Sequence, residues 1–317
     1  MDTHDRDSVG SAPAFDAVVV GGGPAGLSAA LLLGRCRRRV RVYDEGQPRN
    51  AASHALHGYL SRDGIPPGEL LRIGREELRR YDTVQWRSVG VTGVRRLTDS
   101  FEVAISDGSS VTTRTVLLTT GVVDQLPPVP GLQDFYGSSV FHCPYCDGWE
   151  LRDQPLVIYG KGEHGRGMAR ELTAWSAQLF LCTDGPSELS DEDLGQLRQL
   201  GIVIHESKIS ELEGSGGVLE RIRFADGTSV SCRAMFFSTG EYQRCGLAAQ
   251  LGCEFTPKGT VNTGEYETTN IPGLFVAGDA SRNVQSVIVA AAEGYEAAVA
   301  INTRLLAQDL TARTQLP

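Results

Sequence analysis

Short apolar runs alternate with stretches of helical spacing along the chain. Residues 15–20 form a short apolar run, the pattern of a buried parallel strand. Residues 27–36 are rich in Ala and Leu and predict a helix, and residues 40–43 predict a second strand. A strand, a helix and a strand in this order indicate a βαβ unit with a parallel sheet.

The same order of elements returns in the second half of the chain. Residues 156–159 predict a strand, 167–177 a helix and 179–182 another strand. Further apolar runs predict three strands and a long C-terminal helix, at 202–204, 219–224, 230–237 and about 284–306. The repeat predicts an α/β fold with two Rossmann-like, doubly wound, three-layer nucleotide-binding domains.

Residues 83–118 follow a different pattern. Apolar and polar residues alternate there in short runs, and turn residues interrupt them at 98–100 and 107–108. This alternation predicts a small antiparallel sheet inserted into the first domain.

A glycine loop joins the first strand to the first helix. Gly21, Gly23 and Gly26 fit the pattern G-x-G-x-x-G, and Asp44 ends the second strand about 20 residues further on. Glycines let the backbone approach a pyrophosphate at the helix N-terminus, and the acid accepts hydrogen bonds from ribose hydroxyls. The alternative is a glycine turn without a ligand. In this context the pattern favours a dinucleotide site.

A second glycine loop follows the strand at 156–159. Gly160, Gly162 and Gly165 repeat the pattern, and Asp184 follows the next strand. A site for the 2′-phosphate of NADP normally offers an arginine at that position, whereas a carboxylate repels the phosphate. The second domain therefore takes NADH, binds a nicotinamide weakly, or has lost that role.

A third motif lies near the C-terminus. A short strand ends at Gly278 and Asp279, before the long helix. An aspartate there can bond ribityl hydroxyls, and the helix N-terminus favours negative charge on a reduced flavin. Gly121 and Asn50 are further candidates for binding FAD, although the loop that holds Asn50, His54 and His57 has an equal alternative as a polar surface loop.

The redox chemistry is predicted to lie at Cys143 and Cys146, with Asp147 directly behind them. A Cys-x-x-Cys turn usually lowers the pKa of one thiol, and the thiolate is the species that attacks a disulfide. A neighbouring carboxylate can exchange protons with the leaving thiol. A zinc site would need two more ligands, and the other five cysteines form no second Cys-x-x-Cys. We therefore predict no metal.

Two neighbours of the cysteines have alternative interpretations. His142 either tunes the Cys143 thiol or forms a surface hydrogen bond at a strand end. Trp149 is expected to pack in the core or at an interface, with a substrate pocket as the alternative.

Length, composition and charge narrow the class of protein. A chain of 317 residues predicts two domains, and 41% hydrophobic with 22% charged residues is typical of a soluble protein. A net charge of −9 argues against a nucleic-acid partner. The apolar runs are too short for a membrane span. Residues 1–12 are polar, without a signal-peptide core, and are expected to form a disordered tail of a cytoplasmic protein.

In the order of these four motifs, the chain resembles the low-molecular-weight thioredoxin reductases of the pyridine-nucleotide/disulfide flavoproteins. The resemblance covers about 15–306. It implies FAD in a discontinuous domain, built from 13–123 and 245–317, and a pyridine-nucleotide-type domain at 124–244 that carries the cysteines. It also implies a homodimer.

The resemblance also implies a role for individual residues. Cys146 faces the flavin, Cys143 exchanges with the substrate, Asp147 is the acid/base, and Gln285 lies beside the isoalloxazine. The FAD contacts implied by position are Gly21, Gly23, Gly26, Asp44 and Asp279.

The segment from Cys143 to Glu150 is also similar to a branch of this family, the dithiol oxidases that close disulfides in natural products such as gliotoxin and holomycin. Those enzymes pass electrons through FAD to oxygen or NADP. The missing arginine after Cys182 favours this branch, whereas Asp147 is typical of thioredoxin reductases. We expect oxidation of a small dithiol. The alternatives are NADPH- or NADH-dependent reduction of a thioredoxin-like protein, and a flavin redox sensor without turnover.

Overall fold

The structure is a computed structural model that describes residues 13–314. The predicted tail at 1–12 lies outside the described residues. The chain forms two compact units. Of the described residues, the first unit comprises 13–47, 71–121 and 243–314, and the second comprises 48–70 and 122–242. This grouping differs from the predicted boundaries mainly at 48–70, which belong to the second unit.

The first unit is built on a seven-stranded sheet in which β1 (Phe15–Val20) is central. β1 pairs in parallel with β2 (Val40–Tyr43) on one side and with β6 (Ser110–Leu118) on the other. β3 (Val84–Arg87) and β17 (Leu274–Val276) extend the parallel part. Every residue of β1 is buried, as expected for a strand covered on both faces.

The predicted antiparallel insertion is joined to this sheet. β4 (Val91–Arg96), β5 (Phe101–Ile105) and the first half of β6 form an antiparallel meander. The second half of β6 pairs with β1 and β17. The predicted antiparallel strands are therefore present, but they continue the main sheet because the nine-residue β6 belongs to both parts. Residues 84–87, predicted within the insertion, form a parallel edge strand instead.

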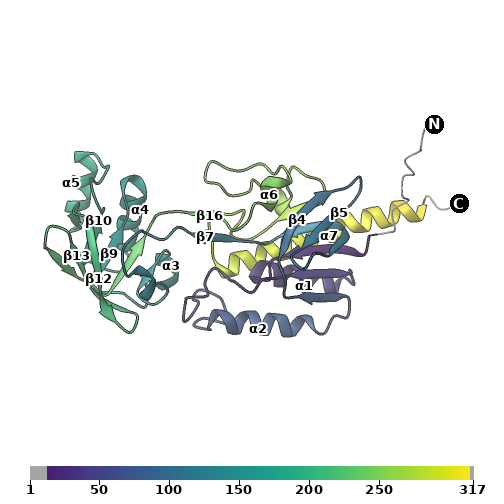
Figure 1. Ribbon diagram of the computed structural model, residues 1–317, viewed down its shortest axis with the longest axis horizontal. Helices are drawn as coiled ribbons and strands as arrows, with labels where there is room; N and C mark the ends of the chain where they lie inside the picture. Colours follow the sequence, from purple (N-terminus) through teal and green to yellow (C-terminus); the bar gives the residue numbers. More distant parts are fainter. Residues whose placement is uncertain (1–12, 315–317) are drawn as a thin grey trace. The chain divides into compact units, whose positions relative to one another are not determined.

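Helices cover one face of this sheet. α1 (Pro24–Arg35), α2 (Pro67–Leu78) and the long α7 (Val287–Thr314), yellow in Figure 1, share a core with Ala17 and Val19. The alternate residues Val18 and Val20 pack against the meander and α6 (Leu247–Gln250) on the other face. The alternation of β1 side chains thus produces three layers.

The second unit contains a five-stranded parallel sheet. Its strand order is β11-β10-β9-β15-β8. The strands are β8 (Val140–Phe141), β9 (Leu156–Tyr159), β10 (Leu179–Cys182), β11 (Val203–His205) and β15 (Ala234–Phe237). Helices α4 (Gly162–Leu172) and α5 (Asp191–Gln199) pack on one face, through Ile158, Leu172 and Leu197.

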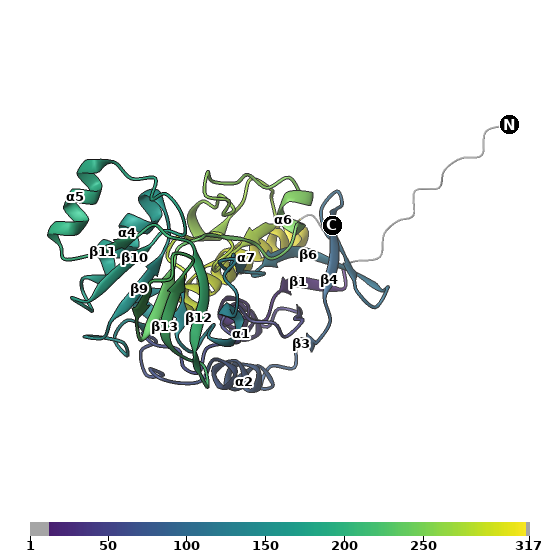
Figure 2. The ribbon, with the colours of Figure 1, turned by 60° about the vertical axis from the view of Figure 1, so that its left-hand side comes forward.

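A three-stranded antiparallel sheet covers the other face. β12 (Ile209–Ser215) and β13 (Val218–Phe224) run side by side in Figure 2, and β14 (Ser229–Ser231) completes the sheet. Residues 230–237, predicted as one strand, are divided between this sheet and β15. The helix predicted at 167–177 begins earlier, at Gly162, inside the glycine loop.

Short elements complete the two units. They are the two-stranded pair β7 (Val122–Asp124) and β16 (Glu241–Gln243), the helix α3 (Pro144–Asp147), and the turns η1 (Leu132–Asp134) and η2 (Glu265–Glu267). Within the described part of the chain, no helix is long and apolar enough to span a bilayer. The predicted fold class, with two doubly wound α/β units, is confirmed.

Candidate active site

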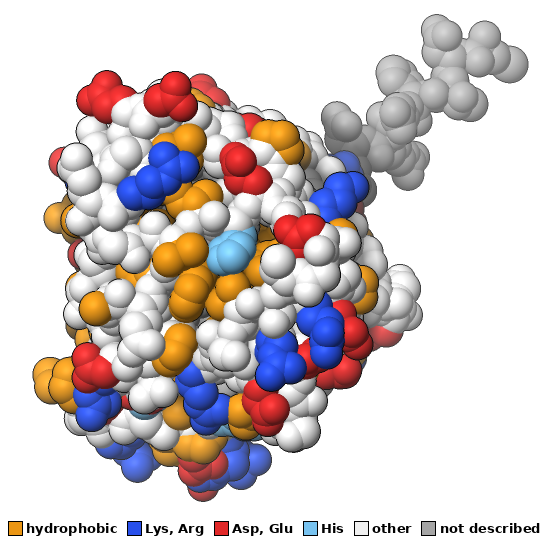
Figure 3. Space-filling model, turned by 90° about the vertical axis from the view of Figure 1, so that its left-hand side faces the viewer, with side chains coloured by type: hydrophobic (Ala, Val, Ile, Leu, Met, Phe, Trp, Pro, Cys, Tyr) orange, Lys and Arg blue, Asp and Glu red, His pale blue; other side chains and the backbone are white. Residues whose placement is uncertain are grey.

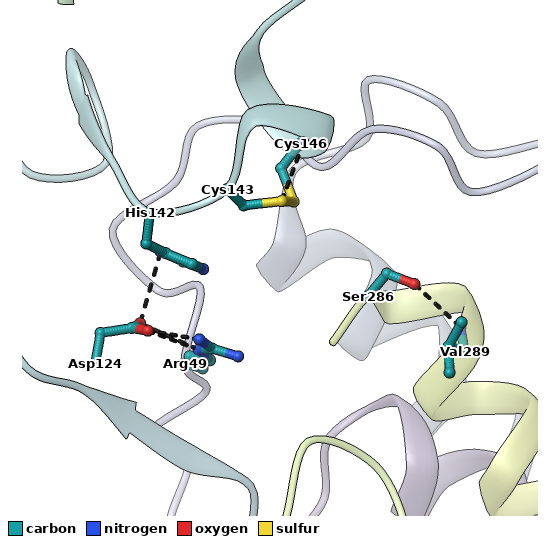
Figure 4. The surroundings of a disulfide bond; sticks show 7 residues. All are labelled: Arg49, Asp124, His142, Cys143, Cys146, Ser286 and Val289. Atoms are coloured by element: carbon teal, nitrogen blue, oxygen red, sulfur yellow. Dashed lines mark hydrogen bonds and ion pairs between the residues drawn. A yellow bond between two sulfur atoms is a disulfide. The ribbon is translucent and has the colours of Figure 1, made fainter. Parts of the chain in front are cut away.

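Cys143 and Cys146 form a disulfide at the start of α3. Their Cα atoms are 5.3 Å apart. Cys143 is the N-cap of α3, and its Sγ accepts a hydrogen bond of 3.1 Å from the N–H of Cys146 (Figure 4). Across residues 13–314, no three His, Cys, Asp or Glu side chains are placed to hold a metal ion. The pair has the geometry of a redox centre.

Asp147 is the last residue of α3 and is half-buried. Burial raises the pKa of Asp147 to about 7, an effect that Glu150 reinforces and His57 opposes. His57 also lies 3.6 Å from Glu150, between its Nε2 and a carboxylate oxygen. A carboxyl group with this pKa can release and accept protons near neutral pH.

A polar network beside the disulfide was missed by the sequence analysis. Asp124, at the end of β7, accepts hydrogen bonds from Nε and an Nη of Arg49 and from the hydroxyl of Tyr136. His142 Nδ1 lies 3.7 Å from Asp124 Oδ2. Figure 4 shows the His142 ring between this pair and Cys143. No local pattern reveals the network, because Arg49 and Asp124 are 75 residues apart.

Aromatic side chains surround the disulfide on the outside of α3. Tyr145 lies between the two cysteines in sequence and packs edge-on against Trp175. Trp149 is 65% exposed, so it does not pack in the core, and packing at an interface or in a substrate pocket stays a prediction. The Arg152 guanidinium lies 4.2 Å from the centre of the Trp149 ring. Tyr145 and Trp149 therefore present exposed rings close to the cysteines in sequence.

The first glycine loop has the close approaches that the motif requires. A Cβ on Gly26 would lie 2.0 Å from the Gly21 carbonyl oxygen, and Gly21 itself has a φ of +109°. The Gly22 N–H donates to Asp44 Oδ1 over 3.0 Å. Positions 21 and 26 therefore require glycine, and the loop turns tightly from β1 into α1.

The N-terminus of α1 fits a phosphate. Its N-cap, Gly23, provides no side-chain hydrogen bond, and space is open around it. The first N–H groups of α1 are therefore available to an anion. Asp44 stands at the adjacent strand end, where the ribose of FAD would lie.

The third motif rests on a buried ion network in the same unit. The Gly278 N–H donates to Glu293 Oε2 over 2.8 Å, and Arg282 binds both Glu293 and Glu267. Burial raises the pKa of Glu293 to about 7. Gln285 lies two residues before α7, and its Nε2 donates to the carbonyls of Asp279 and Arg282. The network fixes the turn that carries Asp279.

The second glycine loop is also tight. A Cβ on Gly165 would lie 2.6 Å from the Gly160 carbonyl, and α4 begins at Gly162 with a positive φ of 52°. Asp184 does not stand free beside this loop. Its Oδ1 accepts from the Ile209 N–H over 2.7 Å, and its Oδ2 lies 3.4 Å from the Tyr159 hydroxyl. The carboxylate therefore has a structural role in joining β10 to β12.

Acidic groups accompany the basic ones near this loop. Arg166 pairs with Glu163 and Asp193, and Lys161 lies 3.8 Å from Glu188. On the face of the second unit shown in Figure 3, Lys and Arg side chains are interspersed with Asp and Glu. The acidic partners of Arg166 and Lys161 reduce the attraction of this loop for a 2′-phosphate.

The predicted site residues divide between the two units. The first unit holds the first glycine loop, Asp44, Gly121 and the third motif, while the second holds the cysteines and the second loop. Asn50, His54 and His57 belong to the second unit. His54 Nε2 lies 3.0 Å from the Ser138 hydroxyl.

Comparison with known proteins identifies the family. The model of the pyridine nucleotide-disulphide oxidoreductases matches residues 15–294. The chain belongs to this family. It is a flavin-dependent thiol–disulfide oxidoreductase of the thioredoxin reductase type, as the sequence predicted, and the Cys143–Cys146 disulfide fits a redox pair. The family uses FAD and a pyridine nucleotide.

Individual relatives cover nearly the whole chain. Thioredoxin reductase tcpT of Claviceps purpurea is 32% identical over 92% of this chain and 94% of its own. Thioredoxin reductase sirT of Leptosphaeria maculans is 30% identical over 95% and 98%. The crystal structure of HlmI matches with a TM-score of 0.91 at 34% identity, over 95% of each chain.

Proposed function

We propose that the protein is an FAD-dependent dithiol oxidase. Cys143 and Cys146 oxidise a small-molecule dithiol to a disulfide, and the electrons pass to oxygen or to a pyridine nucleotide. In this proposal, residues 13–123 and 245–317 bind FAD, and 124–244 form the pyridine-nucleotide-type domain. The enzyme acts in the cytoplasm, where substrate thiols are reduced.

The position and hydrogen bonds of Asp184 are the observation that favours one direction of electron flow over the other. Its carboxylate stands where an NADP-dependent enzyme normally offers an arginine, and it is engaged with Ile209 and Tyr159. A ribose would have to compete with these bonds, and a 2′-phosphate would meet a negative charge. This arrangement therefore favours a dithiol over NADPH as the donor of electrons.

The first half-reaction is thiol–disulfide exchange between the substrate dithiol and the Cys143–Cys146 disulfide. A substrate thiolate attacks Cys143 Sγ, the bond to Cys146 breaks, and Cys146 leaves as a thiolate. The second substrate thiol loses its proton to solvent, and its thiolate attacks the substrate sulfur bound to Cys143, closes the substrate disulfide and releases Cys143. Two electrons and two protons have moved from the substrate to the cysteine pair.

Asp147 provides the proton exchange at Cys146. Its pKa of about 7 lets the carboxyl group protonate the Cys146 thiolate and accept that proton again. When bound, FAD supplies the two-electron acceptor that returns the pair to the disulfide. The residues proposed to hold FAD are Gly21, Gly23, Gly26, Asp44, Asn50, Gly121, Gly278, Asp279 and Gln285.

Reduction of a thioredoxin-like protein by NADPH or NADH is the second candidate. Relatives such as tcpT and sirT are named thioredoxin reductases, which favours it. The N-terminus of α4, where no side chain of the N-cap Lys161 caps the helix, leaves room for a dinucleotide at Gly160, Gly162 and Gly165.

Oxygen consumption with dithiothreitol as the probe tests the proposal. We expect the wild-type protein to consume oxygen in proportion to the dithiol, without any nicotinamide. Cys143→Ser and Cys146→Ser should each abolish this, because both sulfurs are needed for exchange. Cys36→Ser is the control and should keep full activity, since Cys36 lies outside the disulfide. Insulin reduction that requires NADPH and a thioredoxin, without dithiol oxidation, would favour the second candidate.

A further inference from the structure

His142 occupies a fixed position between the disulfide and a buried carboxylate. It directly precedes Cys143 and follows β8. Its Nδ1 lies 3.7 Å from Asp124 Oδ2, and its ring packs against Phe237 with centroids 6.2 Å apart. In Figure 4 the ring extends in the same direction as the Cys143 side chain.

Asp124 is ionised and held in place. Its side chain is 6% exposed, and burial alone would raise its pKa. The bonds from Arg49 and Tyr136 and the charge of His142 outweigh burial, so the pKa of Asp124 lies below its usual value. The same carboxylate and burial raise the pKa of Tyr136, which stays a neutral donor.

The carboxylate orients the imidazole. A negative oxygen opposite Nδ1 keeps a proton on that nitrogen and leaves Nε2 to exchange a proton elsewhere. Charged or titratable groups near the ring include Asp124, Arg49 and Tyr136, and Asp147 is close enough to act on Tyr136. Arg49 and Asp124 compensate each other, so a proton taken up by His142 adds net positive charge beside Cys143.

We propose that His142 exchanges protons with the thiols that react at Cys143, and that Asp124 and Arg49 are positioning residues for its ring. This inference rests on the proposed function and deepens it. His142 accepts the proton of the first substrate thiol, whose thiolate then attacks Cys143 Sγ. When the second substrate sulfur displaces Cys143, His142 protonates the departing thiolate. The hydrogen bond from the Cys146 N–H stabilises the same sulfur.

Alkylation of a single thiol tests the inference without substrate. In a Cys146→Ser background, the rate at which iodoacetamide alkylates Cys143 is measured from pH 5 to 10. We expect a midpoint below the ordinary thiol value of about 8.5. His142→Gln should raise the midpoint by at least about one pH unit, because an opposite charge near a thiolate has an effect of that size. Asp124→Asn should raise it by less.

His205→Gln is the matched control. His205 lies in the same unit and stacks on Phe224, with ring centroids 4.9 Å apart. Its replacement should leave the midpoint unchanged. Asp124→Asn also provides an independent test if His142→Gln does not fold, which the flavin absorbance spectrum reports.

An unchanged midpoint in both His142→Gln and Asp124→Asn would overturn the inference. The assay needs neither substrate nor electron transfer. A protein that shows the shift but does not oxidise dithiols would therefore contradict the proposed function and leave the role of His142 intact.

Discussion

The pKa values of three buried or half-buried acids, Asp124, Asp147 and Glu293, differ because their neighbours differ. Burial raises the pKa of Asp147 and of Glu293 to about 7. The pKa of Asp124 is lowered despite burial, because Arg49 donates hydrogen bonds to it from Nε and an Nη and Tyr136 donates another. Glu293 keeps its raised pKa although Gly278 and Arg282 donate to it, because burial and the nearby Glu267 charge outweigh these donors. At the residue scale, the balance of burial, donors and neighbouring charges decides whether a buried acid is a fixed charge or a proton carrier.

Asp147→Asn tests the proton carrier. Asp147 is a carboxylic acid below pH 7 and a base above it, so dithiol-driven flavin reduction should accelerate as the pH rises through about 7. The Asp147→Asn variant should lose this pH-dependent acceleration and should react about 10² to 10⁴ times more slowly. Rapid-mixing absorbance between pH 5.5 and 8.5 measures it. Glu150→Gln changes an exposed neighbour and should keep the step but move it to lower pH, because the Glu150 charge helps to raise the pKa of Asp147. An unaltered profile in Asp147→Asn would contradict the assignment.

Glu293→Gln tests the buried network under Gly278. The folded-state pKa of Glu293, about 7, exceeds the ordinary glutamate value of 4.5, so the folded protein binds an extra proton between these limits. This contribution to stability is present at low pH and is lost as the pH rises through 7. The free energy of unfolding of Glu293→Gln, relative to that of the wild type, should therefore be about 1–3 kcal/mol higher at pH 8 than at pH 5.

Urea unfolding at the two pH values measures this gain. Glu296→Gln changes an exposed acid on the same helix and should show no such dependence. Equal effects of Glu293→Gln at pH 5 and pH 8 would show that Glu293 does not carry the proton.

At the scale of elements, α1 and α7 pack closely against each other above the parallel sheet. A Cβ on Gly294 of α7 would lie 2.0 Å from the carbonyl oxygen of Ala25 in α1. Residues on both sides of Gly294 are buried in the same core, among them Ala290 and Ala297. The close crossing of the two helices therefore requires glycine at position 294, which has no side chain. The crossing positions the glycine loop at the start of α1.

Gly294→Ala should separate the two helices. Overpacking of this kind costs about 1–3 kcal/mol and should also weaken FAD retention. Thermal unfolding and the flavin content of the purified protein measure both effects. Gly195→Ala, in α5 with open space around the Cβ, should instead stabilise by about 0.5–1 kcal/mol. A Gly294→Ala protein as stable as wild type would contradict the close crossing.

The sequence predicted those elements whose cause is local. Buried parallel strands such as β1 and β9 are continuous apolar runs, and they were predicted within a residue. α4 was placed five residues late, because its first turn contains glycines that weaken a helix and that packing against β9 overrides. Asp124 was missed because its partner Arg49 is distant in sequence and a lone acid after a strand carries no signal.

At the scale of the whole molecule, α7 presents an apolar stripe to solvent. Five side chains recur at intervals of seven or four residues and are 40–52% exposed: Ile288, Tyr295, Val299, Leu306 and Leu310. These intervals place them on one side of the helix, as in helix–helix interfaces. The homodimer implied by the family resemblance would cover this stripe with a second copy of the chain.

Light scattering during size-exclusion chromatography tests the dimer. The wild-type protein should have twice the 34.1 kDa of one chain. Leu306→Glu should shift it to the mass of a single chain, because a buried charge in the interface has no partner. Leu200→Glu changes an equally exposed leucine in the second unit and should remain dimeric. A Leu306→Glu protein that stays dimeric would exclude this stripe as the interface.

The direction of electron flow is the central claim, and an anaerobic titration tests it most directly. The oxidised protein is mixed with dithiothreitol, NADH or NADPH in separate runs, and the flavin absorbance is followed. We predict rapid bleaching by the dithiol and slow or no bleaching by either nicotinamide, with Asp184 as the reason. Rapid bleaching by NADPH, with none by the dithiol, would contradict the account and make a thioredoxin-like disulfide the substrate.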